Sequence, residues 1–112
     1  MCRVFFQSSN SLDVHEVWER TNEHGITYWD HTVMSHQVER GDYVYIGPSK
    51  NIRTAMPDNA PVAIVGKLVK KERLNVAEEW TSNKTGESDS EYVARHYIRD
   101  MQPVSNRELK AI

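Results

Sequence analysis

The segment Val62–Val69 constrains the fold of this chain more than any other feature of its sequence. Apolar residues occupy both alternating sets of positions in this segment, so a strand over it would bury both of its faces. Such a strand lies in the middle of a sheet, with other elements packed on each side. Gly66 within the segment indicates a bulge or a close approach by a neighbouring backbone.

Shorter strands are predicted on either side of this central segment. β-Branched and aromatic residues predict strands over Arg3–Gln7, Ile26–Trp29, Tyr43–Gly47 and Tyr92–Met101, the last ended by Pro103. In the last strand, alternation places Arg95, Tyr97 and Arg99 on one face and His96 on the other. Loops are predicted over Pro48–Pro61 and, as a polar surface excursion, over Asn75–Ser90.

Two helices are predicted from their capping signals. Asp13 is suited to cap the first helix, because Glu16 follows three residues later as in a capping box. One helical face then carries Val14, Val17, Trp18 and Thr21, which predicts that Trp18 is a core residue. Gly25 is expected to end this helix. Ser105 is expected to cap a short terminal helix over Asn106–Ala111.

These elements predict an α+β fold, a small curved sheet or barrel of about five strands with an N-terminal helix and a short C-terminal helix. The chain of 112 residues is expected to form one domain, 1–112. No apolar run approaches the roughly 18–20 residues that span a bilayer, and no signal peptide is recognisable at the N-terminus. Because a single cysteine, Cys2, also fits a reducing compartment, we expect a cytoplasmic protein, or a nuclear one in a eukaryote.

Three stretches of the chain, in order, resemble the EVE domain of the PUA-like superfamily. They are Thr27–Asp30, then Arg40–Ile46 with Ala63–Lys70, and finally His96–Met101 with Ser105–Lys110. The resemblance implies a PUA-like fold and a pocket that takes a nucleic-acid base. Around that pocket the chain has Phe5–Ser9 and His31–Met34 where the family has other residues.

Aromatic and basic residues are the candidates for such a site, because bases stack on aromatic faces while cations follow the phosphates. Trp29 follows a predicted helix end and stands outside the regular apolar pattern, so we place it in the pocket and not in the core. The predicted ligand-binding residues are Ser8, Trp29, Tyr43, Tyr45 and Tyr97. The predicted contacts to the nucleic-acid backbone are Lys67, Lys70, Lys71, Arg95 and Arg99. Any single tyrosine could instead be a half-buried sheet residue, and the basic run a solvated strand end.

Composition and spacing limit the other function classes. The formal net charge is −2, so nucleic acid would have to bind a local basic patch. The histidines and Cys2 lack zinc-ligand spacing, so neither a metal nor a cofactor is expected. We therefore predict a non-catalytic domain that binds DNA or RNA through a modified or flipped base. Two alternatives remain open: an ASCH-like amidohydrolase acting on a modified nucleoside through Lys50 and Thr54, and an inhibitor that contacts a protein through Pro48–Pro61.

Overall fold

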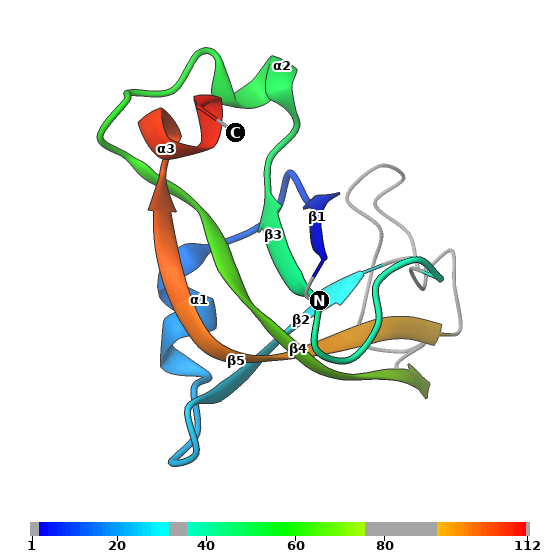
Figure 1. The fold of residues 1–112 in the computed structure, drawn as a ribbon. Coiled ribbons are helices and arrows are strands. Elements are labelled where there is room, and N and C mark those ends of the chain that lie inside the picture. Colours follow the sequence, from blue (N-terminus) through cyan, green and yellow to red (C-terminus); the bar gives the residue numbers. More distant parts are fainter. Residues whose placement is uncertain (1–2, 32–35, 76–91, 112) are drawn as a thin grey trace.

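The computed structural model describes residues 3–31, 36–75 and 92–111 of the chain. It contains a five-stranded mixed sheet and three short helices, which confirms the α+β class (Figure 1). The strands are β1 (Val4–Ser8), β2 (Ile26–His31), β3 (Tyr43–Gly47), β4 (Pro61–Asn75) and β5 (Tyr92–Ser105). The helices are α1 (Val14–Glu19), α2 (Lys50–Arg53) and α3 (Asn106–Lys110). Apart from Asn75, which ends β4, the predicted surface excursion over Asn75–Ser90 lies outside the described residues.

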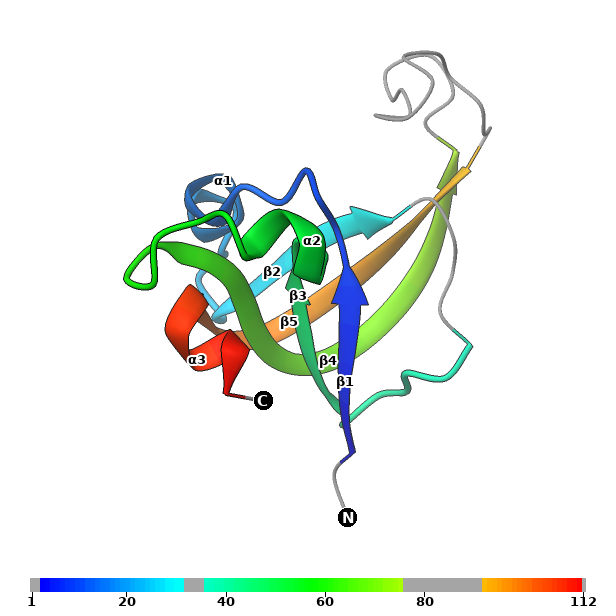
Figure 2. The ribbon, with the colours of Figure 1, turned by 90° about the horizontal axis from the view of Figure 1, so that it is seen from above.

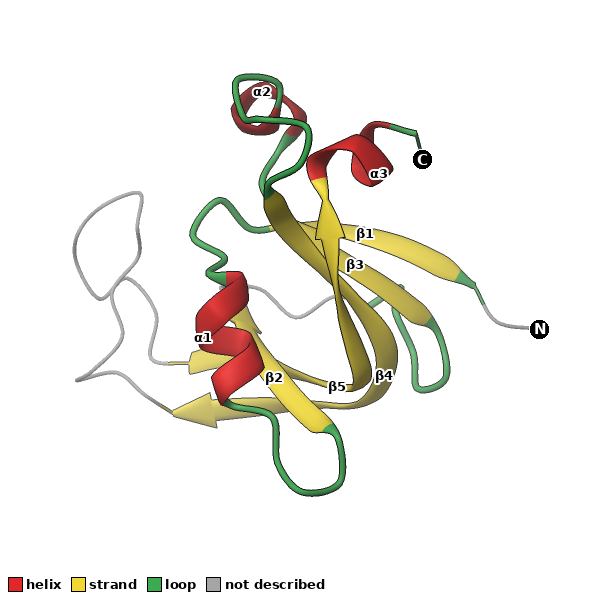
Figure 3. Ribbon diagram, turned by 90° about the vertical axis from the view of Figure 1, so that its left-hand side faces the viewer, coloured by secondary structure: helices red, strands yellow, loops and turns green. Residues whose placement is uncertain are grey.

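The sheet has the strand order β1-β3-β4-β5-β2, so the doubly apolar strand lies at its centre, as predicted. The pair β1/β3 is parallel, and the other neighbours are antiparallel. The long strands β4 and β5 bend strongly and carry the sheet around its core (Figures 2 and 3). Helices α2 and α3 lie together at one end, and α1 lies against β2 and β4.

Two apolar clusters explain why both faces of β4 are apolar. The larger cluster fills the inner side of the curved sheet, and its buried members are Val17, Trp29, Val38, Val44, Ile46, Ile64, Leu68, Ile98 and Met101. The smaller one packs α3 on the sheet through Val62, Ala63, Val104 and Leu109. One chain segment therefore contributes to a core on each side.

Trp18 and Trp29 exchange the roles predicted for them. Trp18 is 55% exposed, whereas Trp29 is 8% exposed and belongs to the inner cluster, so both predictions are wrong. The physical reason is the length of α1, which spans six residues and buries only Val17. The inward positions of β2 are instead Thr27 and Trp29, which alternate with half-buried neighbours.

The element ends also differ in part from the predictions. Asp13 caps α1, accepting from the N–H groups of His15 and Glu16 at 3.0 and 3.2 Å. The helix ends at Glu19 with Arg20 as its C-cap, and Gly25 (φ +75°) belongs to the following turn. Strand β5 continues through Pro103, because β2 pairs with it only as far as Arg99 and the missing N–H then faces a free edge. The predicted Pro48–Pro61 loop contains α2.

Replacing Gly66 by alanine is expected to lower the free energy of unfolding by about 1–3 kcal/mol through overpacking. A Cβ atom there would lie 2.0 Å from Ile98 Cγ2 and 3.0 Å from the Arg99 carbonyl oxygen. The ladder is irregular at this point, where Asp100 has a positive φ of 56°, so the prediction of a bulge or close approach is confirmed. Urea unfolding measures the loss. The double variant Gly66→Ala/Ile98→Ala should lose less than the sum of the single variants, and strict additivity would contradict the steric explanation.

Candidate nucleic-acid interface

Tyrosines and basic residues line up on the outer face of the sheet, opposite the larger core cluster. The ladder registers place Tyr43, Lys67 and Arg99 in one row across β3, β4 and β5. The next row holds Lys70, Tyr97 and Tyr28 on β4, β5 and β2. Paired residues of neighbouring strands point to the same side of a sheet, so these six side chains form one surface. We call it the tyrosine–cation face.

A bulge in β4 brings the two lysines of this face together. Leu68 pairs with Ile98 and Lys70 pairs with Tyr97, so Val69 is the extra residue. Strict alternation would place Lys67 and Lys70 on opposite faces, whereas the extra residue returns Lys70 to the outer one. The same shift turns Lys71 to the inner side, in register with His96, so Lys71 does not join the other predicted phosphate ligands.

The rings and cations of the face lie at contact distance. The Tyr28 and Tyr97 ring centroids are 6.1 Å apart, with the planes tilted by 54°. Lys70 Nζ is 4.7 Å from the Tyr97 centroid, and Lys67 Nζ is 6.0 Å from the Tyr43 centroid. Lysine side chains are flexible, so a flat ligand could take their place over the rings while the ammonium groups move to its anionic part. The arrangement thus offers stacking surfaces with positive charge beside them.

Arg95 is placed to hold Tyr28 in position. Its guanidinium makes a two-point ion pair with Asp30, with N–O distances of 2.8 and 3.0 Å, and lies 3.9 Å from the Tyr28 centroid. Arg20 approaches the same ring to 4.8 Å. The hydrogen bonds to Asp30 raise the pKa of Arg95 above its ordinary value. Because Asp30 already balances this charge, Arg95 serves the face by fixing a ring.

Four residues of the predicted site lie elsewhere. Trp29 and Lys71 occupy inward positions, Tyr45 packs against the α3 cluster, and Ser8 lies beside Gly47 at the far end of β1. A single pocket made of Ser8, Trp29 and the tyrosines therefore does not form. The strand pattern shows alternation within a segment, but it does not show which side of the finished sheet becomes the core.

A pair of histidines, the buried His96 and the half-buried His31, lies on the inner side. The His31 and His96 rings meet edge to face at a centroid distance of 4.6 Å. Among the described residues, His31 Nε2 and both ring nitrogens of His96 have no hydrogen-bond partner. Burial, followed by the neighbouring His96, lowers the pKa of His31 to about 4, and burial also lowers the pKa of His96. Both rings are therefore neutral at pH 7.

The residues nominated for hydrolysis are both on α2. Lys50 begins the helix and is exposed, while the Thr54 hydroxyl donates to the Asn51 carbonyl at 3.1 Å. In the part of the chain that the structure describes, Lys50 makes no ion pair with a carboxylate. Within the same residues, no three His, Cys, Asp or Glu side chains are grouped as metal ligands.

No protein-family model, curated protein or solved structure matches this chain. The resemblance to the EVE domain accordingly stays a prediction. Among the described helices, none is long and apolar enough to cross a membrane.

Proposed function

We propose that this protein binds single-stranded or locally unpaired nucleic acid on the tyrosine–cation face, without catalysing a reaction. One observation carries the proposal: the Tyr28 and Tyr97 rings adjoin each other at 6.1 Å, with Lys70 over one ring and Lys67 and Arg99 in the next row. Stacking platforms bordered by cations suit nucleic-acid strands whose bases are exposed. The resemblance to the EVE domain supports a flipped or modified base as the group that stacks.

Acidic residues limit the path of a bound strand across the sheet. Glu72, Arg95 and Asp30 form the row beyond Lys70, Tyr97 and Tyr28. Glu72 lies 3.3 Å from Lys70 Nζ and accepts a hydrogen bond from the Tyr97 hydroxyl at 3.4 Å. Its carboxylate would repel phosphates, so the backbone of the strand is expected to stay on the side of Lys67 and Arg99.

Replacing Tyr97 by alanine is expected to weaken binding of a 12-nucleotide single strand about 5- to 150-fold. That range corresponds to the roughly 1–3 kcal/mol that stacking on an aromatic side chain contributes per base. Fluorescence anisotropy with labelled DNA and RNA oligonucleotides measures the dissociation constants. Tyr97→Phe is the matched control, because it keeps the ring, and it should retain most of the affinity.

Salt dependence tests the cationic part of the same site. If Lys67, Lys70 and Arg99 each neutralise one phosphate, the log–log slope against salt should be about −2 for a single strand. Glutamine at any one of these positions should make the slope less steep. A slope near zero, or equal binding by Tyr97→Ala and the wild type, would contradict the proposal.

A further inference from the structure

Exposed apolar side chains continue the tyrosine–cation face onto the edge strand β1. Val4 is 60% exposed and Phe6 44% exposed. Val4 pairs with Tyr43 and therefore extends the row of Tyr43, Lys67 and Arg99 by one strand. Phe6 is the next outward residue of β1 and lies in register with Tyr45. The outer face thus presents apolar surface on β1, next to the cations of β4 and β5.

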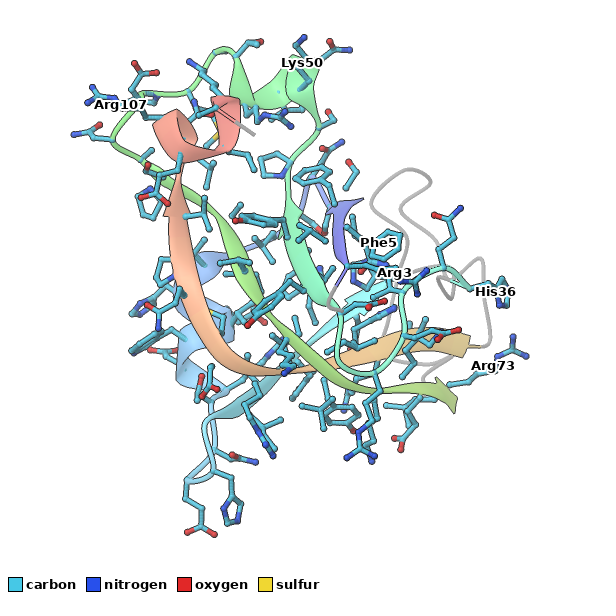
Figure 4. The ribbon with its side chains drawn as sticks, in the orientation of Figure 1. Arg3, Phe5, His36, Lys50, Arg73 and Arg107 are labelled. Atoms are coloured by element: carbon cyan, nitrogen blue, oxygen red, sulfur yellow. The ribbon has the colours of Figure 1, made fainter. Side chains whose placement is uncertain are left out.

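The Phe6 ring repeats the arrangement found at Tyr97. Arg53 of α2 places its guanidinium carbon 5.3 Å from the Phe6 centroid, and its Nη1 donates to the Pro48 carbonyl at 3.2 Å. Lys50 stands on the same helix, at the end of the sheet to which β1 and β3 lead (Figure 4). Phe6 therefore combines an exposed aromatic face with a positioned cation, one strand beyond Tyr43.

The charges around Phe6 favour an anionic occupant with flat groups. A purely apolar partner would cover the Arg53 guanidinium without giving it a counter-charge, and a buried unpaired charge is costly. A nucleotide supplies a base for the ring and a phosphate for the guanidinium. Strands in a sheet are spaced by about 4.8 Å, so Phe6 on β1 lies about 14 Å across the sheet from β5. Its register through Tyr45 and Val65 leads to Gln102, which is five residues, or roughly 17 Å of strand, from Tyr97. That separation fits a single-stranded site of several nucleotides.

We infer that the strand bound at Tyr28 and Tyr97 continues across β3 to β1, where Phe6 stacks a second base and Arg53 contacts its phosphate. This inference rests on the proposed function and adds a second stacking position to it. The site then has a length requirement, because only an oligonucleotide of several nucleotides reaches both the Tyr97 and the Phe6 rings. A very short oligonucleotide contacts one ring alone.

Oligothymidines of 4 and 12 nucleotides test the inference by fluorescence anisotropy. Phe6→Ala should weaken the 12-mer about tenfold and leave the 4-mer unchanged, whereas Tyr97→Ala should weaken both lengths. Val4→Ala is the matched control, because it removes exposed apolar surface of the same strand without removing a ring, and it should not change either affinity. Arg53→Gln should reduce the salt slope of the 12-mer alone.

Two results would overturn the second position while leaving the proposed function standing. One is an unchanged 12-mer affinity in Phe6→Ala when Tyr97→Ala still weakens binding. The other is an equal loss at both lengths. If neither oligonucleotide binds the wild-type protein, the proposed function fails and the inference with it.

Self-association through β1 is the other outcome that would overturn the inference. Sedimentation would then detect concentration-dependent dimers of the wild-type protein, and Phe6→Ala would abolish them. Phe6 is partly exposed, so thermal melts of Phe6→Ala should match those of Val4→Ala.

Discussion

Replacing Trp29 by alanine is expected to lower the free energy of unfolding by about 3–5 kcal/mol, the range for truncating a buried large aromatic side chain. Trp29 is 8% exposed and packs in the cluster on the inner side of the sheet. Its indole Nε1 also donates to Ser9 Oγ at 2.9 Å. That bond joins the edge strand β2 to the chain just after β1, the opposite edge of the same sheet. Loss of the ring therefore removes core contacts and a link across the open side of the curved sheet.

Trp18→Ala is the matched control for this experiment. Its side chain is 55% exposed on α1, and substitutions at exposed positions usually change stability by less than about 0.5 kcal/mol. Urea unfolding of the two variants, followed by circular dichroism, compares the losses directly. An equal loss in both variants, or a larger one in Trp18→Ala, would contradict the assignment of Trp29 to the core.

Local patterns in the sequence predicted the five strands and the N-caps of α1 and α3, since these depend on neighbouring residues. Strand β3 has the predicted bounds, Tyr43–Gly47. Ser105 caps α3, its hydroxyl accepting from the Glu108 N–H at 3.2 Å. The central position of β4 followed from apolar residues on both of its faces, and the structure confirms it. In each case the information lies within a few residues of the feature it determines.

The candidate site was predictable only in part, because some of its geometry depends on distant residues. Alternation correctly placed Arg95, Tyr97 and Arg99 on one face of β5. It could not show that Asp30, 65 positions away, neutralises Arg95. The extra residue at Val69 turns Lys70 outward and Lys71 inward, and nothing in the sequence of Lys67–Arg73 shows that bulge. Sequence patterns therefore predicted which types of residue form the tyrosine–cation face. The pairing register of the strands determines which individual residues lie on it.

Acidification from pH 6.5 to about 4 is expected to destabilise the protein by about 3 kcal/mol through His31, with a further loss through His96. The pKa of His31 is lowered to about 4 from 6.5, chiefly by burial. Between these values the unfolded chain binds a proton that the folded state does not, so stability is present above pH 6.5 and falls as the pH decreases. The charged groups that act on the pair are Asp30, which raises both pKa values, and Lys71, which lowers that of His96. Urea unfolding at pH 7, 6, 5 and 4.5 measures the loss.

His96→Leu separates the histidine pair from other acid-sensitive groups. Both ring nitrogens of His96 lack a hydrogen-bond partner among the described residues, so an apolar side chain should not destabilise the protein at pH 7. The variant should lose less stability than the wild type between pH 6.5 and 4. The pKa of the Asp42 carboxyl is also lowered from its ordinary value of 3.8, chiefly by the Glu39 N–H. The stability that this carboxylate contributes is lost only as it becomes protonated, below about pH 3.8. The two pH ranges are therefore separate, and an unchanged pH dependence in His96→Leu would show that His96 does not contribute to the acid sensitivity.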